Sequence, residues 1–260
     1  QFTYAGHDVI DASALFASVA DGALPSVGFT AYGGAGDDTI LGSAAPDYLA
    51  GGSGDDTITG GRGSDQIYGD NGVTLDVITR ELTIPWVNGS VHPNRDDLTA
   101  GEDVLVGDDV DSTENTANEY DDVIFGDYGD VRQDIASATV GLLSGTPGED
   151  AVYGYVNPVQ LQKIETALRI REIATVRPED GADDDIWGNG GRDRIFGGNG
   201  ADDIDGGSDS NVVFGDNGRM LYLELADQLM FDSANDGTVT TLHLVESINF
   251  PQGGADTIVT

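Results

Sequence analysis

The chain of 260 residues carries 47 acidic residues against 11 basic ones, a formal net charge of -36 at pH 7, and it contains 38 glycines. Such an acidic chain repels phosphates, which argues against nucleic acid and anionic membrane surfaces as partners. The absence of cysteine excludes disulfide scaffolds and thiolate metal sites, and no run of about 18 apolar residues is present to form a transmembrane helix. Because this charge opposes compaction by self-repulsion, we expect the folded chain to bind cations.

The N-terminal part of the chain contains a nine-residue repeat. Its four successive copies read GGAGDDTIL (33–41), GSAAPDYLA (42–50), GGSGDDTIT (51–59) and GGRGSDQIY (60–68). Each copy is rich in glycine at its start, has aspartate in the sixth place and has isoleucine or leucine in the eighth. A flexible glycine-rich linker would not keep this spacing.

The same register returns near the C-terminal end. The later copies read GNGGRDRIF (188–196), GGNGADDID (197–205) and GGSDSNVVF (206–214), and in the last of them Asn211 replaces the repeat aspartate. Isolated copies of the motif surround Asp8, Asp103, Asp122 and Asp256. The array is therefore longer than either run.

The pattern G-G-x-G-x-D-x-U-x, in which U is a large apolar residue, resembles the RTX (haemolysin-type calcium-binding) repeats. The run Asp11 to Leu15, followed by a spacer and GGAGDDTILGS, is similar to the start of such arrays in very large RTX proteins. The resemblance implies an all-β fold, a calcium-bound parallel β-roll, here interrupted by β-hairpin-like insertions. Because the chain begins at Gln1, without a methionine or a signal-peptide pattern, we expect it to be a segment of a longer protein.

The repeat is chemically suited to calcium, a hard cation that takes six to eight oxygen ligands at about 2.3–2.6 Å. Glycine permits positive φ and lets a turn point its carbonyls inward, and the sixth-place aspartate adds a carboxylate. The resemblance implies that each ion lies between alternate repeats. The expected pairs are Asp38 with Asp56, Asp47 with Asp65, Asp184 with Asp202, Asp56 with the turn at Gly69, Asp202 with the turn at Gly215, and Asp193 with the neutral Asn211.

We therefore expect several Ca²⁺ ions, held by aspartates and by turn glycines. The aspartates are Asp38, Asp47, Asp56, Asp65, Asp70, Asp103, Asp122, Asp127, Asp184, Asp193, Asp202, Asp216 and Asp256. The glycines are Gly33, Gly34, Gly36, Gly51, Gly52, Gly54, Gly60, Gly61, Gly63, Gly188, Gly197, Gly198 and Gly200. A looser calcium loop at 109–114 is an alternative use of the acidic residues there, but it lacks the glycine and the bidentate glutamate of an EF-hand.

Three longer segments interrupt the array, and each begins after a Gly-Asp turn. They are rich in strand-favouring residues, and Asn235-Asp236-Gly237 is a hairpin-turn signal. For Leu161 to Val176 we favour a strand over a short helix. The expected division is a roll start and first run (1–72), a hairpin insertion (73–100), repeat turns with an acidic loop (101–130), a long hairpin-like insertion (131–180), a second run (181–218), a hairpin insertion (219–252) and the start of a further repeat (253–260).

No catalytic motif is present, and we do not expect this chain to be an enzyme. The histidines His7, His92 and His243 form no H-E-x-x-H motif, and no G-x-S-x-G elbow occurs. The aromatic residues Trp86, Trp187, Tyr222, Phe231 and Phe250 are expected to close small hairpin cores, with a contact surface as the alternative.

The sequence favours a calcium-binding structural module of a large exported bacterial protein, an adhesin or surface-layer component. A core of thin aliphatic rows does not offset the conformational entropy of folding, so we expect calcium to supply folding free energy and the calcium-free chain to be unfolded. The resemblance implies type I secretion and a secreted or cell-surface location. Neighbouring repeats of the same protein, or a surface protein or glycan, are further expected partners. The alternatives are the secretion and folding domain of an RTX enzyme, or a module that binds a glycan or protein through its insertions.

Overall fold

The computed structural model describes residues 6–26, 28–72, 74–75, 82–83, 99–108, 120–133, 170–222, 242–249, 251 and 253–260. These residues form short strands, one 3-10 turn (Asp21–Ala23) and no α-helix. In this part of the chain no helix is long and apolar enough to cross a membrane.

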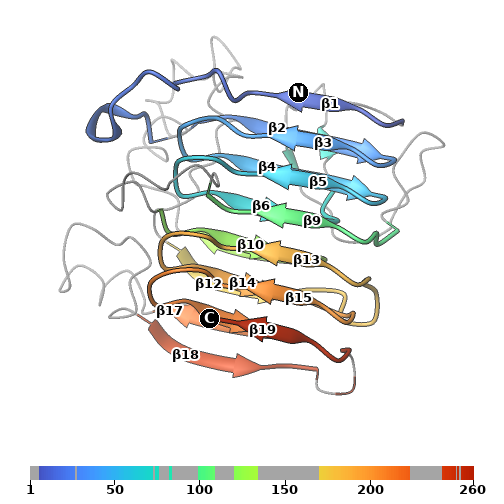
Figure 1. The fold of residues 1–260 in the computed structure, drawn as a ribbon. Coiled ribbons are helices and arrows are strands. Elements are labelled where there is room, and N and C mark those ends of the chain that lie inside the picture. Colours follow the sequence, from blue (N-terminus) through green and yellow to red (C-terminus); the bar gives the residue numbers. More distant parts are fainter. Residues whose placement is uncertain are drawn as a thin grey trace, which may run out of the picture.

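Two parallel sheets form the walls of a roll (Figure 1). The seven-stranded wall contains, in order, β1 (Val9–Asp11), β3 (Thr39–Leu41), β5 (Thr57–Thr59), β9 (Val104–Val106), β13 (Asp185–Trp187), β15 (Asp203–Asp205) and β19 (Thr257–Val259). The six-stranded wall contains β2 (Thr30–Ala35), β4 (Tyr48–Ser53), β6 (Gln66–Tyr68), β10 (Val123–Phe125), β14 (Arg194–Phe196) and β16 (Val212–Phe214). Successive repeats alternate between the walls, which confirms the predicted parallel β-roll.

The core of the roll consists of the eighth-place side chains of both walls. In a three-residue strand the middle side chain points to the opposite face from its two neighbours, and here it points inward. The resulting cluster is at most 2 % exposed and contains Ile10, Ala31, Ile40, Leu49, Ile58, Ile67, Leu105, Ile124, Ile186, Ile195 and Ile204. At the last coil, Ile258 is 45 % exposed.

The roll continues across every interruption of the repeat. Strand β5 pairs with β9, with Ile58 opposite Leu105, and β9 pairs with β13. On the other wall β6 pairs with β10, and β10 pairs with β14. The two runs therefore belong to one stack, and the inserted segments leave it without breaking it.

Each interruption lies inside a nonapeptide rather than between two of them. In intact repeats a Cβ added to the first-place glycine would clash with the carboxylate of the same repeat, as at Gly51 with Asp56. In the interrupted turns, a first-place glycine and a sixth-place aspartate from distant parts of the chain meet in the same way. These pairs are Gly69 with Asp103, Gly107 with Asp122, Gly126 with Asp184, and Gly215 with Asp256.

The second place of the repeat distinguishes continuing turns from interrupted ones on the six-stranded wall. Gly34, Gly52 and Gly198 have φ of 118°, 119° and 120°, a conformation that side chains with a Cβ rarely adopt. In the interrupted turns this place is aspartate, at Asp70, Asp127 and Asp216, and none of these has a positive φ. The backbone therefore takes another direction and the chain leaves the roll.

The middle and third insertions contribute to one antiparallel sheet. Its order is β11 (Gly129–Gln133), β12 (Ile170–Thr175), β17 (Gly218–Tyr222) and β18 (Leu242–Ser247). Each of these two insertions contains an antiparallel pair, β11 with β12 and β17 with β18, as expected of a hairpin-like insertion, and β12 also pairs with β17. In the first insertion β7 (Thr74–Leu75) pairs antiparallel with β8 (Leu82–Thr83). The predicted turn at Asn235-Asp236-Gly237 and residues 161–169 lie outside the described residues.

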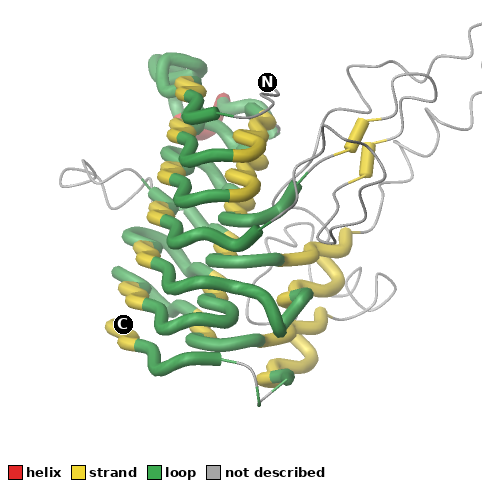
Figure 2. Tube along the Cα trace, turned by 90° about the vertical axis from the view of Figure 1, so that its right-hand side faces the viewer, coloured by secondary structure: helices red, strands yellow, loops and turns green. Residues whose placement is uncertain are grey.

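This antiparallel sheet packs on the outer face of the six-stranded wall (Figure 2). There five ninth-place residues and the seventh-place Tyr48 form an aromatic stack whose neighbouring ring centroids are 4.9–5.8 Å apart. The stack runs through Tyr32, Tyr48, Tyr68, Phe125, Phe196 and Phe214. Ile170, Ile173 and Met220 of the antiparallel sheet belong to the same buried cluster. The protein thus has a second hydrophobic core outside the roll.

Two predicted hairpin aromatics can be placed. Tyr222 is buried in the second core. The prediction is wrong for Trp187, which lies on strand β13 of the roll and is 37 % exposed, because its place in the repeat points outward. Trp86, Phe231 and Phe250 lie outside the described residues.

Removing the first insertion should leave the roll intact. Deletion of residues 72–100 joins Gly69-Asp70-Asn71 to Gly101-Glu102-Asp103 and restores an uninterrupted repeat. We expect the variant to show the same calcium-dependent β signal in circular dichroism and a similar unfolding temperature. As a control, deletion of the intact repeat 60–68 moves every later strand to the opposite wall and should lower stability more, although fewer residues are lost. A larger loss of stability on deletion of 72–100 than on deletion of 60–68 would contradict the idea that the insertion interrupts a single repeat.

Candidate metal sites

The sixth-place side chains of the repeats form two columns, one on each edge of the roll. The first column contains Asp38, Asp56, Asp103, Asp184, Asp202 and Asp256, and the second contains Asp47, Asp65, Asp122, Asp193 and then Asn211. In each step the backbone N–H of one residue donates to Oδ1 of the next, at 2.7–3.2 Å. The hydrogen bonds fix every side chain in the same orientation.

The second oxygen of most column carboxylates is buried without a hydrogen-bond partner. This applies to Oδ2 of Asp38, Asp65, Asp103, Asp122, Asp184, Asp193 and Asp202. Their residues are at most 2 % exposed. Buried polar groups are normally paired, and an isolated buried carboxylate is costly. The repeated absence of a partner at one atom points to a cation.

Each of these oxygens faces a backbone carbonyl across the first-place glycine. A Cβ added at Gly60 would clash with both Asp65 Oδ2 and the carbonyl oxygen of Gly107. Gly107 has the same relation to Asp122 and to the carbonyl of Gly188. These turns gather oxygen donors alone, as calcium prefers. Within the described residues no three acidic or histidine side chains converge on a metal position, so backbone carbonyls must complete a calcium shell.

Burial raises the pKa of buried column carboxyls such as those of Asp103, Asp122 and Asp184, because desolvation disfavours the charged form. The pKa of Asp193 is raised to about 8 and that of Asp202 to about 7. Desolvation and then the charge of Asp47 raise the pKa of Asp65 well above its ordinary value. A cation would reverse this effect by stabilising the carboxylates.

In two turns the sixth-place side chain leaves no carboxylate oxygen without a hydrogen-bond partner. In the turn at 42–47, both oxygens of Asp47 accept hydrogen bonds, from the N–H of Phe29, the N–H of Ser43 and, at 2.8 Å, its hydroxyl. In the turn at 206–211, the amide nitrogen of Asn211 donates to the carbonyl of Gly206 at 2.6 Å and to that of Ser208 at 3.0 Å. The expected weak site at Asn211 is therefore filled by the protein's own N–H donor.

The predicted site residues lie at several distinct places of the repeat. Ten of the thirteen predicted aspartates lie in the two columns, and Asp70, Asp127 and Asp216 lie beside them in second places. First-place Gly33, Gly51, Gly60, Gly188 and Gly197 border a carboxylate. Gly34, Gly36, Gly52, Gly54, Gly61, Gly63 and Gly198 have positive φ. Gly200 permits close approach to the carbonyl of Ala182.

Sequence reasoning missed which aspartates complete the interrupted turns. Asp103 follows Asp56 in the column, where only the turn at Gly69 was expected, and Asp256 follows Asp202 in the same way. The signal was available in the Gly-Asp pairs that precede each insertion, but the matching aspartate follows only after the insertion. The acidic segment 109–114 lies outside the described residues.

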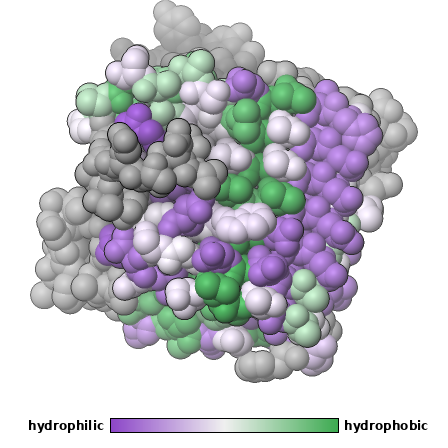
Figure 3. Space-filling model, in the orientation of Figure 1, coloured by the Kyte–Doolittle hydropathy of each residue, from purple (hydrophilic) through white to green (hydrophobic). Residues whose placement is uncertain are grey.

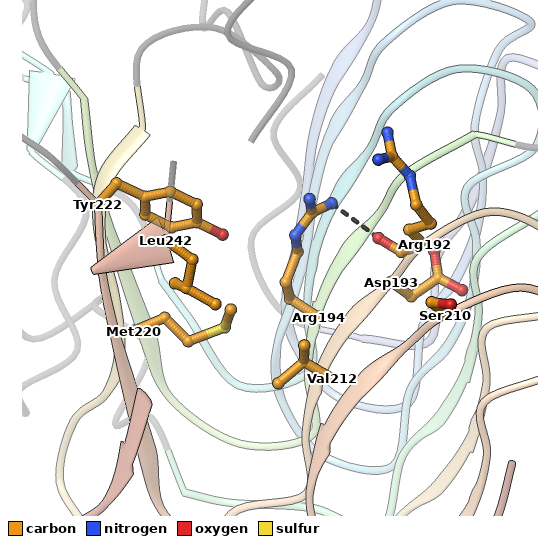
Figure 4. Close-up of a pocket in the computed structure, with 8 residues that line it drawn as sticks. All are labelled: Arg192, Asp193, Arg194, Ser210, Val212, Met220, Tyr222 and Leu242. Atoms are coloured by element: carbon orange, nitrogen blue, oxygen red, sulfur yellow. Dashed lines mark hydrogen bonds between the residues drawn. The ribbon is translucent and has the colours of Figure 1, made fainter. Parts of the chain in front are cut away.

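A narrow space lies between the second core and the roll, lined by Met220, Tyr222, Leu242 and Val212 with Arg192, Asp193, Arg194 and Ser210 (Figure 4). Arg194 donates to the carbonyl of Arg192 at 2.8 Å. The space leaves no room for a water-sized molecule, so it offers no small-molecule site.

Comparison with known families identifies the repeat. A family model of the RTX calcium-binding nonapeptide repeat, in four copies, matches residues 30–49, 41–73 and 180–219. No curated protein and no solved structure matches the chain. The matched residues cover the uninterrupted parts of the roll.

The calcium-free chain should lose stability as the pH rises. Its carboxyls have an unfolded pKa near 3.8 and folded values of about 7 to 8 at Asp202 and Asp193. Between these values the folded state binds more protons than the unfolded state, so the free energy of unfolding falls with rising pH. Circular dichroism of calcium-stripped protein should show more β structure at about pH 5 than at about pH 8, whereas calcium-saturated protein should not lose structure. If the β structure of the calcium-free protein increased from about pH 5 to about pH 8, the assignment of raised pKa values to the folded carboxyls would be contradicted.

Asp56 should serve two neighbouring ions. Its Oδ1 accepts from the N–H of Asp38, and its Oδ2 lies with the carbonyl oxygen of Gly69 beside Gly51, so Asp56→Ala removes an oxygen from the turns on both sides. We expect calorimetry to show two sites weakened by on the order of tenfold each. The exposed Asp203 on the outer face of β15 is the control, and Asp203→Ala should change the calcium affinity of neither site. Loss of one independent site only would show that Asp56 is not shared.

Proposed function

We propose that this chain, whose two repeat runs are RTX calcium-binding nonapeptide repeats, is a calcium-folded structural module of a large exported bacterial protein of the adhesin or surface-layer type. The observation that carries the proposal is the uninterrupted column of sixth-place aspartates from Asp38 to Asp256, all of which except Asp256 are buried. A catalytic or transport role requires no such periodic arrangement along the whole stack.

The columns support a folding role for calcium. The sixth-place carboxylates of most coils are buried, and burial raises their pKa values, as at Asp103 and Asp122. Without a counterion, this arrangement opposes folding at neutral pH. Extracellular calcium modules bind with dissociation constants of about 10⁻⁴–10⁻³ M, so such a chain stays unfolded at low calcium and folds where calcium is abundant. This behaviour suits type I export followed by folding outside the cell.

The arrangement of the insertions supports a structural role. We propose that the division into roll segments (1–72, 101–130, 181–218 and 253–260) and insertions (73–100, 131–180 and 219–252) describes one rigid stack with attached elements. Parallel strands paired across all coils make the stack stiff along its axis, and the second core fixes two of the insertions to one wall. The secretion domain of an RTX enzyme would share the calcium chemistry. Only the presence of a catalytic domain in the same protein would distinguish it from the proposed structural module.

One surface favours a second candidate function, a contact with a protein or glycan. The outer face of the seven-stranded wall shows a band of apolar residues beside strongly hydrophilic turns (Figure 3). Val9, Trp187 and Val259 on this wall are 72 %, 37 % and 54 % exposed. A binding module would use this face of the roll, rather than the insertions that the sequence suggested.

Circular dichroism with metal titration tests the proposed function. The chelated protein is titrated with Ca²⁺ and, in parallel, with Mg²⁺, which demands a smaller octahedral shell. We expect a cooperative transition from coil to β structure with calcium alone. A chain that is already fully β-structured in chelator would show that the second core carries the fold, and would move the binding function to first place.

A further inference from the structure

The outer face of the seven-stranded wall changes in character along the stack. The first and third residues of each three-residue strand point outward together. On β3 and β5 these places hold three threonines and a leucine, and on β9 they hold two valines. On β13 and β15 they hold Asp185, Trp187, Asp203 and Asp205. The roll itself therefore does not require acidic residues at these places.

Strand pairing fixes the neighbours of Trp187. Val106 of β9 lies opposite it on one side and Asp205 of β15 on the other. Asp185 precedes it by two residues on the same face, directly opposite Asp203. Because neighbouring strands are about 4.8 Å apart, an indole with an apolar neighbour on one side is bordered by carboxylates on the other sides.

This arrangement costs stability without a visible return inside the molecule. Like charges directly opposite each other in a sheet are destabilising, and aspartate is depleted in strands. Within the described residues the exposed carboxylates of Asp185 and Asp203 take part in no ion pair or hydrogen bond. Solvation would explain the charges alone, but it does not explain why Trp187, 37 % exposed, lies among them.

Charge decides what can cover this face. A second copy of the chain has the same net charge of -36 and carries the same carboxylates, so it is repelled. Phosphate-bearing partners are repelled for the same reason. A metal ion lacks a complete ligand set, because no three acidic or histidine side chains converge within the described residues. The face is complementary to a cationic partner.

Arginine fits both parts of the face. Its planar guanidinium stacks on aromatic rings, and its forked donors pair with carboxylates. Trp187 and Asp185 lie on one strand and provide both kinds of contact. Lysine supplies the charge but not the planar group, and a neutral glycan would use the indole but not the charges.

We propose that the outer face of β13 and β15 binds a partner protein through an arginine-bearing segment, whose guanidinium group stacks on Trp187 and pairs with the carboxylates beside it. Apolar side chains of the same segment would contact Val106. This inference deepens the second candidate function by naming the partner's chemistry. It rests on the proposed calcium-folded module, because the face exists only in the folded roll.

The test uses calcium-saturated protein and two short peptides, one of alternating arginine and leucine and one of alternating lysine and leucine. Trp86→Phe is the background, because it leaves Trp187 as the single tryptophan, whose fluorescence then reports binding at this face. Asp185→Thr/Asp203→Thr introduces the residue that β3 and β5 carry at the same places. As the control, Glu179→Gln/Asp209→Asn removes two charges from exposed loops elsewhere.

We expect the arginine peptide to bind Asp185→Thr/Asp203→Thr about tenfold more weakly and the control variant within about twofold of the unsubstituted face. The threonine variant should also unfold at a higher temperature, because it loses the like-charge pair. The arginine peptide should bind more tightly than the lysine peptide, and calorimetry of Trp187→Ala should show that this preference is lost.

An equal loss of affinity in the control variant would show only general attraction to an acidic chain and would overturn the surface. A neutral glucose oligosaccharide that changes the fluorescence of Trp187, and binds the threonine variant undiminished while the arginine peptide does not bind, would assign the face to a glycan. Either result, in protein that folds with calcium, overturns this inference alone. A chain that stays unfolded in calcium would overturn the proposed function.

Discussion

The fold depends on how the charge of the buried sixth-place carboxylates is balanced. One oxygen of each is satisfied by a backbone N–H of the neighbouring coil, as between Asp65 and Asp122, which ties the turns together. The other oxygen has no partner at most column positions. A protein can bury such a row only if each charge is neutralised. Stacking of the coils and cation binding are therefore one process, and the high net charge of the chain follows from it.

This coupling explains how a short repeat accommodates long insertions. A turn needs only its first-place glycine and its sixth-place aspartate at the right positions, and the proposed calcium ion would hold these two places whether or not they are close in the chain. Gly126 and Asp184 meet as Gly51 and Asp56 do. The strands pair in register across each interruption, so the cost of an insertion is mainly the entropy of closing its loop.

The second core gives the molecule a source of stability that does not use metal. The aromatic stack from Tyr32 to Phe214 lies on the outer side of one wall, and strands from two insertions cover part of it. Because aromatic pairs at these separations contribute beyond their buried area, the six-stranded wall is stabilised from both faces. The other wall exposes Val9 and Trp187, so the two sides of the roll have different roles.

The nine-residue repeat, through its resemblance to the RTX repeats, predicted the β-roll and the calcium chemistry. The spacing itself indicated the inward-facing aliphatic row, because a repeat of that length allows one turn and one short strand with one inward side chain. The sequence also marked each departure from the roll with a Gly-Asp pair. Only the tertiary structure showed that Asp103 completes the turn begun at Gly69 and that β12 and β17 share a sheet. These contacts join residues separated by insertions of irregular length, and their partners are selected by packing between coils, which no local pattern encodes.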